Sequence, residues 1–319
     1  MSSIFPQKYF KNIPLECLGN IIEFVKEESK SSLYSCILVN RQWMKSGLPL
    51  LWNRPFDILT PVSPNSTKLM NTYISCLSEA QKRYLSDNGI YLRQNLTPQV
   101  NYPAYLRELD YEIFERYTRF WLIENIYSDR ASDLDSITES LESSDIEYAN
   151  NQLKKLLSCL FSMFIEKSIN LTHFSFYSDG DMCLDIPDLH TWMPPAATYS
   201  TTNNSLIVSS SHVLRSTASN NSNFWKNLTT FKCEVDDSDL HLPNLITFME
   251  ILSTRCKMLQ TIIFTWRSQY DTNVHNYLKE IVRQQQQLKV IRVDYNDINI
   301  NRVDEIFRLE NVKNLNVDN

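Results

Sequence analysis

The chain has 319 residues, of which 43% are hydrophobic, and a net charge of −6, so it can bury a full core and its length favours about two domains. It shows neither a secretory signal nor an apolar run long enough to cross a membrane, and we expect a soluble protein of the cytoplasm or nucleus. Its four glycines are too scattered for a phosphate-binding loop or a nucleophile elbow. The sequence therefore predicts no catalytic residue and no cofactor.

Metal and nucleic-acid binding are also unexpected. The seven cysteines are far apart and mostly lie in apolar patterns, which favours buried free thiols over a disulfide framework or a zinc site. The five histidines show no metal-binding spacing. Basic and aromatic residues do not cluster as they do in nucleic-acid-binding proteins.

Three short helices are predicted within the amino-terminal segment that ends at Phe56. The first runs from Pro14 to about Lys26, where apolar residues recur at helical spacing. A second begins after the serine pair 31–32, which can cap it, and a shorter third covers 41–45. Because so short a segment can bury only some of its large apolar side chains, the remainder must pack against the rest of the chain or against a partner.

A helical connector is predicted next. Two segments within 68–127 have helical periodicity and are joined by a loop. Between Asp129 and Glu147 there are seven acidic residues and one basic residue, which is typical of a solvated segment. We therefore expect three parts: residues 1–56, a connector with an acidic serine-rich loop over 57–150, and a third domain over 151–319.

The third part contains a repeated pattern, with apolar residues at the first, fourth and sixth places. The copies are LTHFSF from Leu171, LTTFKC from Leu228, LQTIIF from Leu259, LKVIRV from Leu288 and VKNLNV from Val312. Helical segments separate the later copies, so a strand plus a helix repeats from Leu228 to the end of the chain. The interval from Leu171 to Leu228 is about twice as long as the later ones and predicts one degenerate repeat there, although the polar tract 198–223 is expected to be a loop. The pattern resembles a leucine-rich repeat, and an ordinary α/β domain with parallel strands is the alternative.

Apolar and polar landmarks follow one another in a set order near the amino end. They are Ile13, Pro14, Leu15, Glu16, Ile21, Ile22, Leu33, Val39, Asn40, Arg41, Trp43, Leu51 and Trp52. Their order and spacing resemble an F-box over about residues 11–56, and the whole chain is similar to fungal F-box proteins with divergent leucine-rich repeats. The resemblance implies an α+β fold with an amino-terminal three-helix F-box, a helical connector and a carboxyl-terminal α/β repeat array.

The resemblance also implies a function. In that family the F-box binds the Skp adaptor of a Skp–cullin–F-box ubiquitin ligase, and the remainder selects the target protein, so the chain itself is expected not to be an enzyme. The residues implied in adaptor binding are Ile13, Pro14, Leu15, Ile21, Leu33, Val39, Trp43, Leu51 and Trp52. Two alternatives remain: an interaction or scaffold protein outside any ligase, and a hydrolase or transferase with an unrecognised site.

A target-binding surface follows from the strand period of two, because residues at the third, fifth and seventh places of each repeat should face away from the core. These candidates are His173, Ser175, Tyr177, Thr230, Lys232, Glu234, Thr261, Ile263, Thr265, Val290, Arg292 and Asp294. Their mixed chemistry suits a protein or peptide better than a nucleic acid, which would require a basic stripe.

Overall fold

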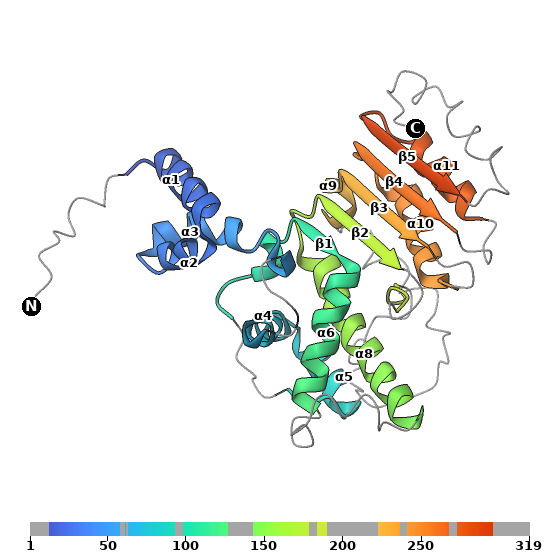
Figure 1. Cartoon of the computed structure of the whole chain (residues 1–319), viewed down its shortest axis with the longest axis horizontal. Coiled ribbons are helices and arrows are strands. Elements are labelled where there is room, and N and C mark those ends of the chain that lie inside the picture. Colours follow the sequence, from blue (N-terminus) through green and yellow to red (C-terminus); the bar gives the residue numbers. More distant parts are fainter. Residues whose placement is uncertain are drawn as a thin grey trace, which may run out of the picture. The chain divides into compact units, whose positions relative to one another are not determined.

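The computed structural model describes residues 13–57, 61, 63–92, 98–126, 143–178, 184–189, 223–236, 241–267 and 273–295 (Figure 1). Within these ranges helices and strands are mixed, which confirms this broad feature of the predicted fold class. The chain divides into two compact units between Pro55 and Phe56, here called the helical unit and the sheet unit. The predicted repeat from Val312 and nearly all of the predicted loop at 198–223 lie outside the described residues.

The described part of the helical unit contains helices α1 (Leu15–Glu28), α2 (Lys30–Ile37) and α3 (Arg41–Leu51). Helix α2 begins after Ser29, whose hydroxyl accepts a hydrogen bond from the Ser32 backbone N–H at 3.3 Å, so its cap precedes the predicted serine pair. Asn40 caps α3, with its Oδ1 2.9 Å from the Gln42 nitrogen and 3.1 Å from the Trp43 nitrogen. Side-chain caps therefore set where two of these three helices begin.

The core of the helical unit is small. Its buried cluster consists of Leu18, Ile22 and Leu33. Partly buried residues packed around this cluster are Ile13, Val25, Trp43, Leu50 and Leu51. Helix α3 extends beyond the predicted 41–45 and supplies Gly47, where an added Cβ would lie 2.5 Å from the Ile37 Cγ2 atom. Glycine therefore permits the close approach of α3 to α2.

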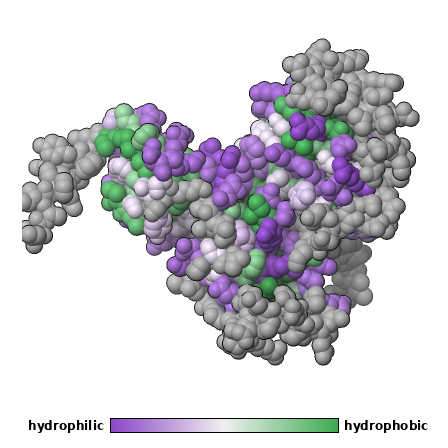
Figure 2. Space-filling model, in the orientation of Figure 1, coloured by the Kyte–Doolittle hydropathy of each residue, from purple (hydrophilic) through white to green (hydrophobic). Residues whose placement is uncertain are grey.

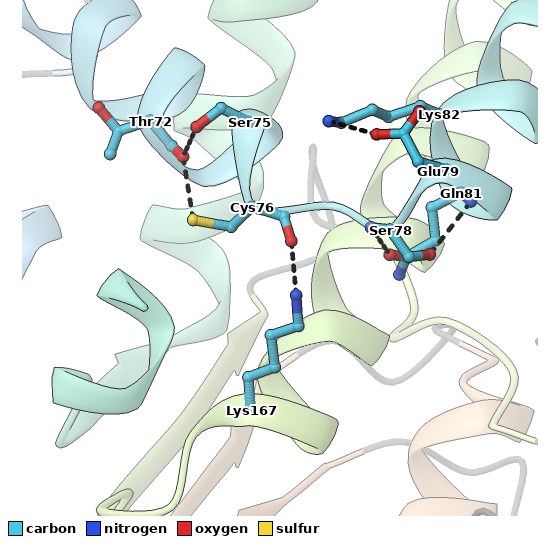
Figure 3. A network of polar contacts seen from close by, with 8 residues as sticks. All are labelled: Thr72, Ser75, Cys76, Ser78, Glu79, Gln81, Lys82 and Lys167. Carbon is cyan, nitrogen blue, oxygen red and sulfur yellow. Dashed lines mark hydrogen bonds and ion pairs between the residues drawn. The ribbon is translucent and has the colours of Figure 1, made fainter. Parts of the chain in front are cut away.

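The 3₁₀ turn η2 (Pro55–Asp57) spans the division between the two units. The helices of the sheet unit before its main strands are α4 (Pro64–Ser75), α5 (Glu79–Asp87), the turn η3 (Tyr102–Tyr105), α6 (Tyr111–Ile126) and α8 (Ser143–Lys167). Polar contacts join the turn between α4 and α5 to α8, as Figure 3 shows in part. A capping box starts α5, with the Ser78 nitrogen 2.6 Å from Gln81 Oε1. Lys167 Nζ donates to the Cys76 carbonyl at 2.6 Å, and Gln81 Nε2 donates to the Cys159 carbonyl at 3.0 Å. These bonds satisfy polar groups that the helix packing buries.

One parallel sheet follows, with strands β1 (Glu108–Asp110), β2 (His173–Ser178), β3 (Thr230–Val235), β4 (Thr261–Trp266) and β5 (Val290–Tyr295). The helices between the later strands are α9 (Asn223–Asn227), α10 (Pro243–Arg255) and α11 (Val274–Arg283). Each strand pairs with the next one in the sequence, and α8, α10 and α11 lie on one side of the sheet (Figure 1). The opposite side of the sheet is here called the outer face. It carries the residues that the two-residue period of a strand predicts to face away from the core.

The predicted degenerate repeat supplies no strand between β2 and β3 of the described sheet. Strand β2 pairs directly with β3 along its whole length, from the His173–Thr230 pair to the Ser178–Val235 pair. The long interval between Leu171 and Leu228 suggested two repeat units, but an interval in the sequence does not require a strand in the sheet. The predicted degenerate repeat therefore adds no strand between β2 and β3, and most of the interval lies outside the described residues.

Strand β1 lies within a segment that was predicted to be continuous helix. Leu106, Leu109 and Tyr111 are buried and have the same apolar spacing as the predicted repeats. Helix α6 starts only at Tyr111, where Asp110 Oδ1 accepts a hydrogen bond from the Ile113 nitrogen at 3.0 Å. The predicted connector thus contributes an edge strand to the sheet, paired with β2.

Aromatic side chains from helices and strands form one core in the sheet unit. The ring centroids of Tyr111 in α6 and Phe176 in β2 are 5.7 Å apart, and those of Phe161 in α8 and Phe174 in β2 are 6.2 Å apart. The ring centroid of Phe248 in α10 lies 4.7 Å from that of Phe174. The predicted boundary between residues 150 and 151 falls inside α8, so the structure places the helical segment and the sheet around a shared core.

Candidate partner-binding surfaces

Large apolar side chains are exposed on the helical unit. They include Phe24 at 63%, Tyr34 at 55%, Leu38 at 69%, Val39 at 57% and Ile21 at 41%. In Figure 2 hydrophobic residues of this unit are visible on its surface as green atoms. Exposed apolar groups of this size on so small a unit are typical of a protein-binding surface.

Eight of the nine residues implied in adaptor binding fall into three groups by their exposure. Pro14, Ile21 and Val39 are exposed, whereas Leu33 is buried in the core and cannot touch a partner directly. The partly buried residues are Ile13, Trp43, Leu51 and Trp52. Leu15 is the first residue of α1. A contact surface on this unit would therefore consist of the exposed group with the outer edges of the partly buried one.

A hydrogen bond brings the beginnings of α1 and α3 together. Gln42 Nε2 donates to the Ile13 carbonyl at 3.2 Å. Exposed Pro14 adjoins Ile13, and exposed Val39 precedes the cap of α3, so both residues lie at this end of the helical unit. Residues from two separate helix beginnings can thus contribute to one surface.

Three exposed apolar residues were missed by the sequence comparison with an F-box: Phe24, Tyr34 and Leu38. Their helical spacing contains the signal. Phe24 follows Ile21 by three positions and Leu38 follows Tyr34 by four, so each pair lies along one helix face beside the core stripe. The sequence signal for these three residues is that their helices contain more apolar residues than a single core-facing side can hold.

The outer face of the sheet brings the candidate target-binding residues together in rows across the strands. One row contains His173, Thr230, Thr261 and Val290; the next contains Ser175, Lys232, Ile263 and Arg292; the third contains Tyr177, Glu234, Thr265 and Asp294. Most of these side chains are exposed or half-buried, whereas Thr230 is only 8% exposed and is the least available to a partner. Figure 2 shows hydrophilic and hydrophobic residues mixed over the strands.

Several outer-face side chains already bind one another. Ser175 Oγ donates to Asp110 Oδ2 at 2.8 Å, so β1 adds an acidic neighbour that the sequence did not place there. Arg267, directly after β4, lies 2.7 Å from Asp236 and 3.5 Å from Asp294. Arg267 is thus paired with acidic residues at the strand ends, whereas the exposed Lys232 and Arg292 of the middle row form no ion pair with another described residue.

A buried carboxylate caps one helix of the sheet unit. Asp185 accepts hydrogen bonds from the backbone nitrogens of Asn244 at 2.7 Å and Leu245 at 2.9 Å, and so caps α10. Burial raises the pKa of Asp185 to about 6, although these bonds act in the opposite direction. Both of its oxygens accept backbone bonds, which indicates a structural role.

Neither surface contains a recognised metal-binding cluster among the residues that the structure describes. Across the described ranges, no group of three or more His, Cys, Asp or Glu residues is arranged to hold a metal ion. No helix of the described chain is long and apolar enough to span a membrane. No family model matches the chain, and searches of curated proteins and of solved structures found no match either.

Proposed function

We propose that the chain is a substrate-recruiting subunit of a Skp–cullin–F-box ubiquitin ligase, acting in the cytoplasm or nucleus. Its helical unit binds a Skp-type adaptor and, through it, a cullin, while the sheet unit binds the target protein. The chain performs no chemistry itself and raises the local concentration of target lysines near the conjugating enzyme. The observation that carries the proposal is the exposed apolar set on α1, α2 and the turn before α3.

Energetics favour a partner with its own apolar surface. Full burial of one large apolar side chain contributes roughly 1.5–3 kcal/mol, and the exposed residues Ile21, Phe24, Leu38 and Val39 still have about half of that available. Association costs about 4 kcal/mol or more, so these four side chains do little more than offset that cost. The partly buried edge, including Trp43, must also lose contact with water for a stable complex to form.

The sheet topology supports the repeat part of the proposal. The strands follow one another in sequence order, all parallel, and the outer-face rows align residues from equivalent places of successive repeats. An ordinary α/β domain usually changes strand order at its centre and has helices on both faces. A one-strand-per-unit sheet is what stacked repeats produce.

The test is co-purification of the full chain with a Skp adaptor and a cullin. Replacing exposed Ile21 and Val39 together by Asp should weaken adaptor binding by about tenfold or more, because two apolar contacts become buried charges. The matched control replaces exposed, polar Glu27 and Lys45 by Ala, which should leave binding within about twofold. Circular dichroism checks that both variants keep their helices.

The outcomes separate the alternatives. Equal adaptor binding by a folded Ile21→Asp and Val39→Asp variant and by the wild type would exclude this surface. Adaptor binding without any cullin would instead favour an interaction protein that uses Skp outside a ligase.

A further inference from the structure

The middle row of the outer face contains two basic side chains that form no ion pair with an acidic residue among those that the structure describes. Lys232 of β3 and Arg292 of β5 are exposed, and neither forms an ion pair with any residue that the structure describes. Both pair in register with Ile263 of β4, so they flank it on either side. Because neighbouring strands lie about 4.8 Å apart, the two basic residues begin about 10 Å apart.

Asp110 of β1 is in register with this row but accepts a hydrogen bond from Ser175, and the other acidic residues nearby are only partly available to neutralise the two basic residues. Asp294 and Asp236 both pair with Arg267 at the end of the strands. Glu234 lies two positions beyond Lys232 on the same strand face, but the structure has no ion pair between the two. Among the described residues the positive charges of the middle row are therefore not paired, whereas Arg267 at the strand ends pairs with Asp236 and Asp294.

The side chain between the two basic residues, Ile263, is apolar. It is half-buried, and its neighbours at the same level are the two long basic side chains, whose aliphatic portions can extend the apolar strip. A free inorganic anion would gain nothing from that strip. A peptide with an apolar side chain between acidic ones would bury the strip and bind both charges.

We propose that the middle row of the outer face, Lys232, Ile263 and Arg292, binds an acidic peptide segment of a partner protein. The segment carries two carboxylates about 10 Å apart with an apolar side chain between them. That separation is close to the one between residues i and i+3 of a chain in polyproline II conformation, whose three residues per turn at about 3.1 Å each place both carboxylates on one side and the apolar side chain of an intervening residue at the flank of that side. The identification of this partner as the ligase target rests on the proposed function, whereas the docking site itself does not.

The test begins with selection of phage-displayed random peptides on the purified full chain. Selected sequences should be enriched in acidic pairs spaced by three positions around an apolar residue. Synthetic peptides copied from them, and matched copies with Gln in place of the acidic residues, are then titrated by fluorescence anisotropy. Replacing acid by Gln should weaken binding about tenfold or more, since each charge-assisted hydrogen bond contributes more than a neutral one.

Charge reversal of the row provides the decisive variant. Lys232→Glu with Arg292→Glu should reduce binding of the acidic peptides at least about tenfold and select basic peptides instead. The control reverses two other exposed lysines, Lys226→Glu with Lys257→Glu, which changes the net charge equally and should leave binding nearly unchanged. Raising the salt concentration should weaken the wild-type complex, because exposed charges are screened.

Each other outcome overturns the inference. Selected peptides without acidic pairs, or no selected peptides at all, would show that the row is not an acidic-peptide site. Equal loss of binding in the control variant would assign the effect to net charge. Adaptor co-purification of the charge-reversed variant is measured in parallel. Retained adaptor binding with failed peptide selection would contradict this inference alone. Successful peptide selection without adaptor binding would contradict only the proposed function.

Discussion

The helical unit and the sheet unit differ in the side chains that they bury. The helical unit is centred on three aliphatic residues, Leu18, Ile22 and Leu33, and leaves several large apolar groups exposed. The largest fully buried side chains of the described chain, all Phe and Tyr, lie in the sheet unit. Because aromatic residues each bury about 150–250 Å², the sheet unit can be stable by itself, whereas the helical unit has most to gain from a partner.

Removal of a central aromatic ring should greatly lower the stability of the sheet unit. Phe248 is fully buried, and its ring centroid lies 4.7 Å from that of Phe174 and 5.1 Å from that of Trp225. Phe248→Ala should lower the free energy of unfolding of this unit by about 4 kcal/mol, through lost burial and the cavity left behind. Urea denaturation measures it, with Phe248→Leu as a control that should cost less than half as much. Equal stability of both variants would show that this core is loosely packed.

A buried amide should be the next most important contact in the sheet unit. Gln285 Oε1 accepts from the Leu259 nitrogen at 2.9 Å, and its Nε2 donates to the carbonyls of Cys256 at 2.9 Å and Ile281 at 2.8 Å. Gln285→Leu should cost about 3 kcal/mol, because buried backbone groups lose their partners. Gln287→Leu, at an exposed position of the same glutamine run, should change stability by less than about 0.5 kcal/mol. Similar effects of the two changes would contradict the assigned bonds.

The buried cap of α10 should make the stability of the sheet unit depend on pH. The pKa of Asp185 is raised to about 6 by burial, so between about pH 4 and pH 6 the folded state binds a proton that the unfolded state has released. Stability from this group is therefore present at low pH and is lost as pH rises through that window. Relative to the wild type, Asp185→Asn should gain about 2 kcal/mol between pH 4 and pH 7. Denaturation of both proteins across this range tests it, and a constant difference would rule it out.

Tight packing in the helical unit should show the smallest effect. Ala at position 47 would place its Cβ 2.5 Å from Ile37 Cγ2, well inside ordinary carbon contact. The helix preference for Ala recovers about 1 kcal/mol of the resulting cost of about 2 kcal/mol, which leaves a net loss of about 1 kcal/mol. The control, Gly19→Ala, meets no atom within 4 Å and should stabilise α1. Equal gains in both variants, measured by thermal unfolding, would show that α2 and α3 can move apart.

Local patterns in the sequence predicted much of the secondary structure. The period of two in each repeat anticipated β2 to β5 and the direction in which their side chains point, since a strand alternates sides wherever it is placed. The helical period likewise anticipated the three helices that precede Phe56. Helix ends were less predictable, because Ser29 and the serine pair 31–32 are equally suitable caps until the backbone conformation selects one.

Only the tertiary structure decided which similar residues are buried, paired or exposed. Leu33 and Leu38 lie in the same short segment, yet one is in the core and the other is 69% exposed, because helix packing selects a face. Gln285 is buried within a run of four glutamines for the same reason. Lys232 and Arg292 are far apart in the sequence and become neighbours of Ile263 only through the register of three parallel strands. Sequence patterns are local, whereas these distinctions depend on contacts between segments that are distant along the chain.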